Sequence, residues 1–235
     1  RTGRPVLLAP SRMPKRGRAG SRRARIALLH AIAHIEYGAI DLAFDLVGRF
    51  GAHFPRAFAD TWLRVGAEEA LHFALIERRL RAHGAAYGDL PAHDGLWESA
   101  RRTADDPLAR LAVVPMLLEA RGLDVTPAMA ARFRSAGDEA SARVLDRILR
   151  DEIRHVAAGV HWFESLCAER GIVPEIQWPI LVARNFGGVL KPPFNHSARE
   201  SAGLTKDFYG ALADAAPGLH ESGRYRGDAD LREAQ

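Results

Sequence analysis

Apolar residues recur at intervals of three and four along much of the chain, which is the period of an amphipathic α-helix. In the first such stretch the apolar face includes Leu29, Ile40 and Val47. Ser21, just before this stretch, is a residue type that caps helix N-termini. The pattern predicts long helices over residues 21–48, 55–84, 107–121 and 139–170.

The segments between and after these helices predict how the helices are arranged. Residues 85–106 hold turn residues and room for one short helix over 96–103, which is enough chain to cross from one end of a bundle to the other. The second and third long helices would then run parallel. Further helices are expected over residues 126–135 after a stop at Gly122, over 174–186 with a break at Pro179, and over 197–212. The predicted fold class is all-α: an antiparallel four-helix bundle with a long crossover and peripheral C-terminal helices.

Six acidic or imidazole side chains fall on the apolar faces of the long helices. Two pairs form the pattern E-x-x-H, and each pair begins 33 residues after another such carboxylate, since 69 − 36 and 152 − 119 are both 33. An unpaired buried charge costs several kcal/mol, so these carboxylates need a partner. The spacing is typical of a dinuclear metal site in a four-helix bundle. The predicted ligands are Glu36, Glu69, His72, Glu119, Glu152 and His155.

The chemistry of this ligand set indicates iron or manganese. Four carboxylates offset the charge of two divalent ions, and one neutral imidazole serves each ion. Carboxylate and imidazole ligands suit iron or manganese, whereas structural zinc sites favour thiolates. We predict two iron ions, with two manganese ions or a mixed pair as alternatives. Glu69 and Glu152 are expected to bridge the ions and Glu36 and Glu119 to bind one ion each, which leaves coordination positions open to dioxygen or peroxide.

An acidic residue precedes each E-x-x-H, Glu68 before the first and Asp151 before the second. One step along a helix turns the side chain by about 100°, toward a neighbouring helix. Metal-bound histidines usually donate their second N–H to a carboxylate or carbonyl. We therefore expect Asp151 to contact His72 and Glu68 to contact His155. The alternative is that both acids are solvated surface groups.

Composition fits one globular domain. The chain has 235 residues, of which 47% are hydrophobic and 26% charged. A single cysteine, Cys167, excludes an intramolecular disulfide framework and fits a reducing cytoplasm. No run approaches the roughly 18 consecutive apolar residues of a transmembrane helix, so no membrane association is expected. We divide the chain into an extended basic arm over residues 1–20, the bundle domain over 21–212 and a loosely held tail over 213–235.

The net charge of +4 is concentrated near the N-terminus, where residues 12–25 contain no acid. Such a stretch can contact the phosphates of a nucleic acid. The alternative is a solvated arm that leads into the first helix. The candidate nucleic-acid contacts are Arg12, Lys15, Arg16, Arg18, Arg22 and Arg23.

Three segments resemble a known family: HAIAHIEYGAIDLA at 30–43, YGDLPAH at 87–93 and DEIRHV at 151–156. With the six ligands, they make the chain similar to the ferritin-like superfamily and, more narrowly, to the bacterial family called domain of unknown function 455, over residues 20–210. That family resembles a tRNA hydroxylase that acts on a modified adenosine and is a di-iron monooxygenase of the same fold. The resemblance implies oxygen activation at a di-iron centre held by the six residues, and it supplies no substrate.

We therefore expect a cytoplasmic di-iron oxidase or monooxygenase. Its partners would be dioxygen or peroxide, an organic substrate for which a tRNA nucleoside is one candidate, and an electron-donor protein, and an oligomer is compatible with the sequence. Tyr37, next to Glu36, is a candidate redox group, with packing as the alternative. The alternative functions are a ferroxidase or iron-handling protein, a dimanganese catalase-like enzyme, and a bundle that binds metal only for stability.

Overall fold

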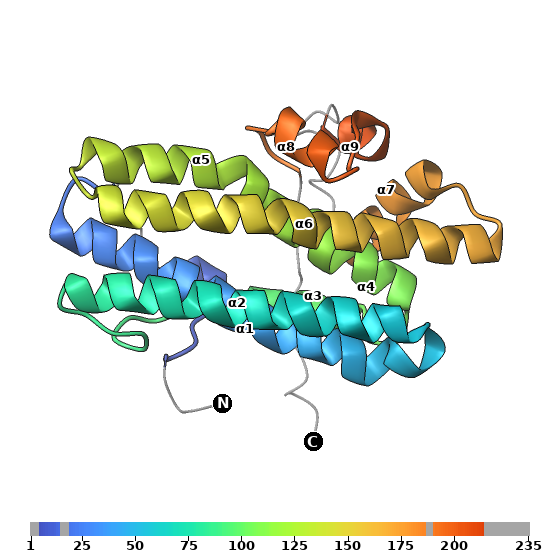
Figure 1. The fold of residues 1–235 in the computed structure, drawn as a ribbon, viewed down its shortest axis with the longest axis horizontal. Coiled ribbons are helices and arrows are strands. Elements are labelled where there is room, and N and C mark those ends of the chain that lie inside the picture. Colours follow the sequence, from blue (N-terminus) through green and yellow to red (C-terminus); the bar gives the residue numbers. More distant parts are fainter. Residues whose placement is uncertain (1–4, 15–18, 187–189, 214–235) are drawn as a thin grey trace, which may run out of the picture.

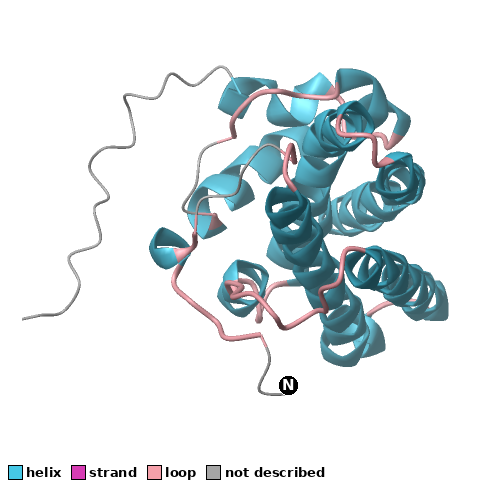
Figure 2. Cartoon of the chain, turned by 90° about the vertical axis from the view of Figure 1, so that its left-hand side faces the viewer, coloured by secondary structure: helices cyan, strands magenta, loops and turns pink. Residues whose placement is uncertain are grey.

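The computed structural model describes residues 5–14, 19–186 and 190–213, and all regular structure within these ranges is helical, as predicted. The long helices lie side by side along the longest axis of the molecule (Figure 1) and are seen nearly end-on in Figure 2.

Helices α1 (Arg22–Phe50) and α2 (Arg56–Ala82) form the first antiparallel pair, joined by the short 3-10 turn η2 (Gly51–His53). Ser21 caps α1, since its Oγ accepts a hydrogen bond from the amide of Ala24 at 3.2 Å. The two helices approach closely at Gly66, where an added Cβ would lie 3.3 Å from the Phe44 ring.

Segment 22–53 is long and apolar enough by composition to cross a membrane. However, 56% of its most apolar window is buried within the fold. Because α1 packs against α2 over its length and places Glu36 in the interior, the helix has the character of a core helix.

The second pair consists of α6 (Glu139–Arg170) and a stretch of three consecutive elements: α4 (Pro107–Val113), the π-helix η3 (Val114–Glu119) and α5 (Ala120–Ser135). The predicted stop at Gly122 and new start near Thr126 are wrong, because α5 is continuous through Pro127. The ring of Pro127 cannot donate to the carbonyl of Leu123. Asn195 donates to that carbonyl instead, through Nδ2 at 3.1 Å, so a distant side chain satisfies the group that the proline leaves open.

The connection over residues 83–106 crosses the length of the molecule and contains α3 (Gly95–Arg102). As a result the chain runs in the same direction along α2 and along the α4–α5 stretch (Figure 1). Buried Arg110 ties the end of this connection to the helices: Nε donates to Thr103 Oγ1 at 2.9 Å, Nη2 donates to the Ala100 carbonyl at 2.6 Å, and Nη1 pairs with Asp45 on α1.

Three helices at the C-terminal end, α7 (Pro174–Asn185), α8 (His196–Ser201) and α9 (Lys206–Ala213), lie beside α4 and α6 (Figure 1). The predicted break at Pro179 is wrong, because α7 is continuous. The single helix predicted over 197–212 is two helices, since Gly203 between them has φ of +77°, a left-handed conformation that ends α8. Residues 214–235 of the predicted tail lie outside the described residues.

The N-terminal segment is not a free arm where the structure describes it. Residues 10–12 form a short 3-10 turn, η1. Leu8 donates its amide to the Ala92 carbonyl at 2.8 Å, and Ala92 donates to the Val6 carbonyl at 3.0 Å. These two hydrogen bonds form an isolated β-bridge that holds the N-terminal segment against the crossover.

Two large apolar cores fill most of the interior, and a charged layer separates them; Leu42, Ala100 and Val114 form a third, smaller cluster. One core takes the N-terminal end of α1 and the C-terminal end of α2, with Leu29, Ile76 and Leu145 among its members. The other takes the opposite ends, with Leu46 and Trp62 among its members. The layer between the two cores holds Glu36 on α1, Glu69 and His72 on α2, and Glu152 and His155 on α6.

Candidate metal centre

The six residues of the predicted ligand set meet between the two cores. Five of them are buried, with exposed fractions between 0% and 7%. Glu119, the last residue of η3, is partly exposed as a residue, but its Oε2 is buried. Four separate stretches of the chain thus contribute polar groups to one interior point.

Glu69 and Glu152 lie between the two imidazoles. Oε2 of Glu69 is 3.5 Å from Nδ1 of His72, while Oε1 of the same carboxylate is 3.0 Å from Nδ1 of His155. Glu152 divides its oxygens in the same way, at 3.8 Å from His72 Nδ1 and 3.7 Å from His155 Nδ1. Each carboxylate therefore presents one oxygen to each histidine.

The other two carboxylates lie next to this centre. Oε2 of Glu36 lies 3.3 Å from Nδ1 of His72. Glu119 interacts electrostatically with Glu152, Glu69 and His155. Ligand atoms of four buried residues lie within 4.8 Å of one another, and this group could hold a metal ion: Glu36, Glu69, His72 and Glu152.

Both imidazoles are oriented from outside the cluster by carboxylates of the opposite helix. Nε2 of His72 lies 3.1 Å from Asp151 Oδ2, and Nε2 of His155 lies 2.8 Å from Glu68 Oε2, which is the pairing that the helix geometry predicts. Arg154 joins the two acids, since its Nη2 donates to Asp151 at 2.8 Å and to Glu68 at 3.3 Å. With Nε2 held in this way, Nδ1 of each imidazole faces the cluster.

Buried polar atoms without hydrogen-bond partners gather at this point. Nine such side-chain atoms occur among the described residues, and six of them belong to the cluster. Buried polar groups are almost always hydrogen-bonded, so six atoms that lack a hydrogen bond at one point in the interior indicate a further partner. A metal ion fits, because carboxylate oxygen and imidazole nitrogen are its usual ligands. The six atoms are Glu69 Oε1 and Oε2, His72 Nδ1, Glu119 Oε2, Glu152 Oε2 and His155 Nδ1.

The electrostatics of the cluster favour a bound cation. Burial, together with repulsion from Glu69, raises the pKa of Glu36 to about 8. Burial and repulsion from Glu152 raise the pKa of Glu119 well above its usual value. Burial lowers the pKa of the His72 imidazole, but the nearby carboxylates of Glu36 and Glu69 outweigh burial and raise the pKa to about 10. Glu36, Glu119 and His72 thus hold their protons more tightly than in water, which is the behaviour of a site with excess negative charge.

The π-helix η3 sets the position of Glu119. Pro115 sits in its first turn and cannot donate a backbone hydrogen bond. The wider turn of a π-helix is a common response to such an interruption and is frequent at functional sites. α6 accommodates the bulge at Gly159, where an added Cβ would lie 2.6 Å from Pro115 Cβ. A proline inside a helical stretch predicts a bend at that point, but the sequence carries no signal for the π-helix.

A cavity of about 150 Å³ borders the four carboxylates and is otherwise mainly apolar. Sequence reasoning missed its walls, because the apolar residues that line a cavity and those that fill a core follow the same periodicity. Apolar members of the lining include Ile35, Leu42, Leu96, Val114, Leu118 and Ile148.

The other candidate residues lie away from the cluster or outside the described part of the chain. The ring of Tyr37 packs against the rings of Phe73 and Tyr87, with 5.5 Å between centroids in both cases, which agrees with the packing alternative. Among the candidate nucleic-acid contacts, Arg12 and Arg23 are exposed. Arg22 donates from Nε to the His83 carbonyl at 2.8 Å. Lys15, Arg16 and Arg18 lie outside the described residues.

Fold and site together define the class: an all-helical protein with a buried carboxylate–histidine cluster that could hold a metal ion. The chain belongs to the family described as "Protein of unknown function (DUF455)", whose model matches residues 1–210. It is 43% identical over 209 residues to a protein of Haemophilus influenzae (strain Rd) with the description "Uncharacterized protein". The match covers 86% of this chain and 72% of that relative. No solved structure matches the chain significantly.

Proposed function

We propose that the protein is a ferritin-like di-iron protein that activates dioxygen to oxidise or hydroxylate an organic substrate. In this proposal α1, α2, the α4–α5 stretch and α6 are the four helices of the bundle, and residues 83–106 are its crossover. The observation that carries the proposal is the division of the oxygens of Glu69 and Glu152 between two histidines. Two metal ions that share a bridging carboxylate, with one imidazole on each ion, would require this arrangement.

The roles of the ligands follow from their positions. Glu36 and His72 would hold one ion, Glu119 and His155 the other, and Glu69 and Glu152 would bridge both. Asp151 and Glu68 keep Nδ1 of each imidazole directed at the ions. A pair of iron ions would supply the redox chemistry with dioxygen.

The apolar cavity supports an organic substrate over iron storage. A path for hydrated iron ions would be polar, whereas the 150 Å³ space beside the carboxylates is walled largely by aliphatic side chains. Such walls exclude water and accept a hydrocarbon group, so they suit attack on a C–H bond. A tRNA nucleoside as the substrate stays a prediction from the family resemblance.

Dioxygen uptake by the iron-loaded protein tests this function. Protein loaded with ferrous iron without air is expected to consume dioxygen when air is admitted. Glu152→Ala removes a bridging carboxylate and should abolish the uptake, while Glu169→Gln, an exposed change on the same helix, should leave it intact. Wild-type protein that binds iron and consumes no dioxygen would refute the proposal. Release of oxygen from peroxide by manganese-loaded protein would favour the catalase-like alternative.

A further inference from the structure

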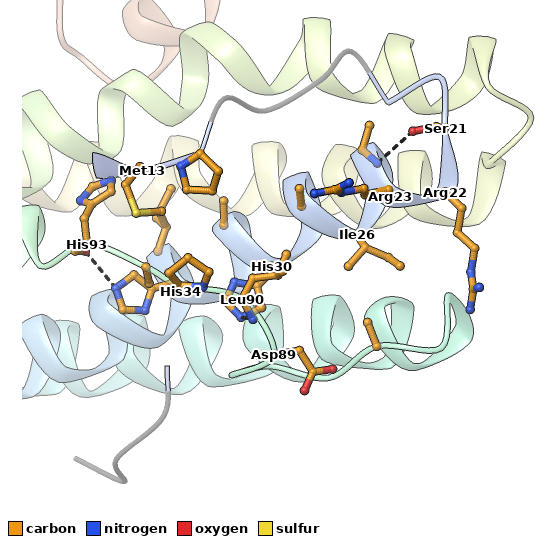
Figure 3. Close-up of a pocket in the computed structure, with 18 of the residues that line it drawn as sticks. Met13, Ser21, Arg22, Arg23, Ile26, His30, His34, Asp89, Leu90 and His93 are labelled. Carbon is orange, nitrogen blue, oxygen red and sulfur yellow. Dashed lines mark hydrogen bonds between the residues drawn. The ribbon is translucent and has the colours of Figure 1, made fainter. Parts of the chain in front are cut away.

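A second and larger cavity, of about 810 Å³, lies along the outer side of α1 between the N-terminal segment and the crossover (Figure 3). Its volume falls in the range of ligand sites, about 300–1,000 Å³. The lining is mostly apolar, from three parts of the chain. These lining residues include Met13 and Pro14 of the N-terminal segment, Ile26, Ala27, Ala31 and Ile35 of α1, and Leu90, Pro91 and Leu96 of the crossover.

The two cavities meet at Ile35 and Leu96, which line both of them. Ile35 is 48% exposed although it neighbours the buried ligand Glu36. Leu96 packs onto α1 at Gly38, where an added Cβ would lie 3.1 Å from Leu96 Cδ1. Two aliphatic side chains thus form the boundary between the outer cavity and the space beside the four carboxylates.

The wall of the outer cavity is preorganised by two histidines of α1. The imidazole of His30 accepts hydrogen bonds through Nε2 from the amides of Gly88 and Leu90, at 3.0 and 3.4 Å. Nδ1 of His34 lies 2.8 Å from the Tyr87 hydroxyl, and Nε2 lies 3.0 Å from the His93 carbonyl. These bonds hold the crossover wall of the cavity against α1, so little ordering of that wall remains when a ligand binds.

The two arginines in the lining lie at the end far from the four carboxylates. Arg22 and Arg23 stand in the first turn of α1, and Asp89 is the one acidic side chain among the described lining residues. Arg22 extends toward the α2 end and Asp89 is held by the Ala86 amide, whereas the side chain of Arg23 lies along the cavity near Ile26 (Figure 3). From Arg23 to Ile35 the helix rises by roughly 18 Å. The site is long, apolar, and cationic at its outer end.

We propose that the 810 Å³ cavity binds an elongated apolar molecule with one anionic end, such as a long-chain carboxylate. The anionic end pairs with Arg23, the apolar body lies along Ala27 and Ala31, and the far end reaches the boundary at Ile35 and Leu96. The identification of this molecule as the substrate of the metal centre rests on the proposed function. The binding site itself does not rest on it, because none of the six candidate metal ligands lines this cavity.

Calorimetric titration of the full chain with dodecanoate, in the presence of a chelator, tests the site without the metal. The affinity should rise about fourfold for each methylene added from octanoate to dodecanoate, as expected for a buried chain. Ala31→Trp fills the cavity and should abolish binding, while Ala74→Trp adds the same bulk at an exposed position of α2. Arg23→Glu should weaken dodecanoate at least tenfold, with Arg64→Glu on α2 as the matched charge control.

One further ligand and one further variant test the two ends of the cavity separately. Dodecyltrimethylammonium carries the opposite charge, and equal affinity for it would overturn the role of Arg23. Ile35→Trp narrows the inner end and should weaken dodecanoate more than octanoate, since only the longer chain reaches the boundary. Dodecanoate binding that is absent, or unchanged by Ala31→Trp, would overturn the site. Because all of these titrations use metal-free protein, their failure is distinct from a failure of the di-iron proposal.

Discussion

At the scale of single residues, the candidate metal centre depends on two imidazoles whose outer nitrogens are engaged by carboxylates. His72 and His155 direct Nδ1 inward because Asp151 and Glu68 occupy Nε2. Hydrogen bonds with these histidines lower the pKa of both acids despite their partial burial, so both are ionised at neutral pH. An ionised carboxylate on an imidazole makes that imidazole a stronger metal ligand.

Asp151→Asn should therefore weaken metal binding without unfolding the protein. The amide can still contact Nε2 of His72, but it no longer supplies the negative charge. We expect the metal affinity to fall by about 10- to 100-fold in a chelator competition assay, with the helical circular dichroism unchanged. The exposed change Glu169→Gln on the same helix serves as the control. Equal affinities for Asp151→Asn and wild type would remove the proposed role of this carboxylate.

A second charged residue acts on stability rather than on the site. Asp138 caps α6, accepting from the amide and hydroxyl of Ser141, and it pairs with Arg79 at 3.0 Å and His83 at 2.7 Å. Burial opposes ionisation of Asp138, but these partners outweigh it and lower its pKa from 3.8 to about 2. A carboxyl with a lower pKa in the folded state stabilises the fold above its unfolded pKa, and this contribution is lost as pH falls from about 4 toward 2.

Asp138→Asn should accordingly lower the free energy of unfolding by about 1–2 kcal/mol at pH 7. The amide keeps the capping geometry and loses the charge. Urea denaturation of both proteins between pH 7 and pH 2 measures the difference, which should shrink below pH 4. A difference that stays constant down to pH 2 would show that ionisation of Asp138 contributes nothing.

At the scale of elements, the packing of the π-helix η3 on α6 determines where Glu119 lies. Pro115 and Gly159 form the contact between these elements, and no side chain fits at position 159 without displacing the proline. Glu119 is the last residue of η3, so a shift of η3 moves a predicted metal ligand.

Gly159→Ala should destabilise the fold by about 1–3 kcal/mol, in the range of an overpacked core, and should also weaken metal binding. Gly122→Ala is the matched control, because nothing lies within 4 Å of its added Cβ, and it should stabilise α5 by about 0.5–1 kcal/mol. Thermal unfolding and metal titration of both variants give the comparison. If Gly159→Ala were as stable as wild type, the contact at Pro115 would not hold η3 in place.

The elements also show what periodicity predicts and what it misses. The bounds of α1, α2 and α6 lie within two residues of those that the apolar spacing predicts, since that signal is local; Ser21 and Asp138 also cap α1 and α6. The predicted helix break at 122–127 relied on Gly122 and Pro127 and is wrong, because the side chain of Asn195 donates to the Leu123 carbonyl that Pro127 leaves open. The six cluster residues follow from one repeated spacing, whereas Arg154, which joins Asp151 to Glu68, depends on the distance between α2 and α6.

At the scale of the whole molecule, a charged layer divides the apolar interior, and each long helix crosses it once. The excess negative charge of this layer lies between two apolar cores, where it is expensive without a counter-charge. Removal of metal should therefore lower the melting temperature of the entire fold rather than loosen one end. The crossover also forms one wall of the outer cavity beside α1. The side chains of Ile35 and Leu96 separate this proposed ligand site from the candidate metal centre.

The most direct test of the central claim is the number of metal ions bound by the purified protein and the distance between them. Metal analysis with X-ray absorption at the iron edge, or anomalous diffraction from a crystal, measures both. We predict two ions per chain, separated by about 3.5–4 Å and surrounded by oxygen with one imidazole nitrogen each. A single ion, or two ions too far apart to share Glu69 and Glu152, would contradict the di-iron account.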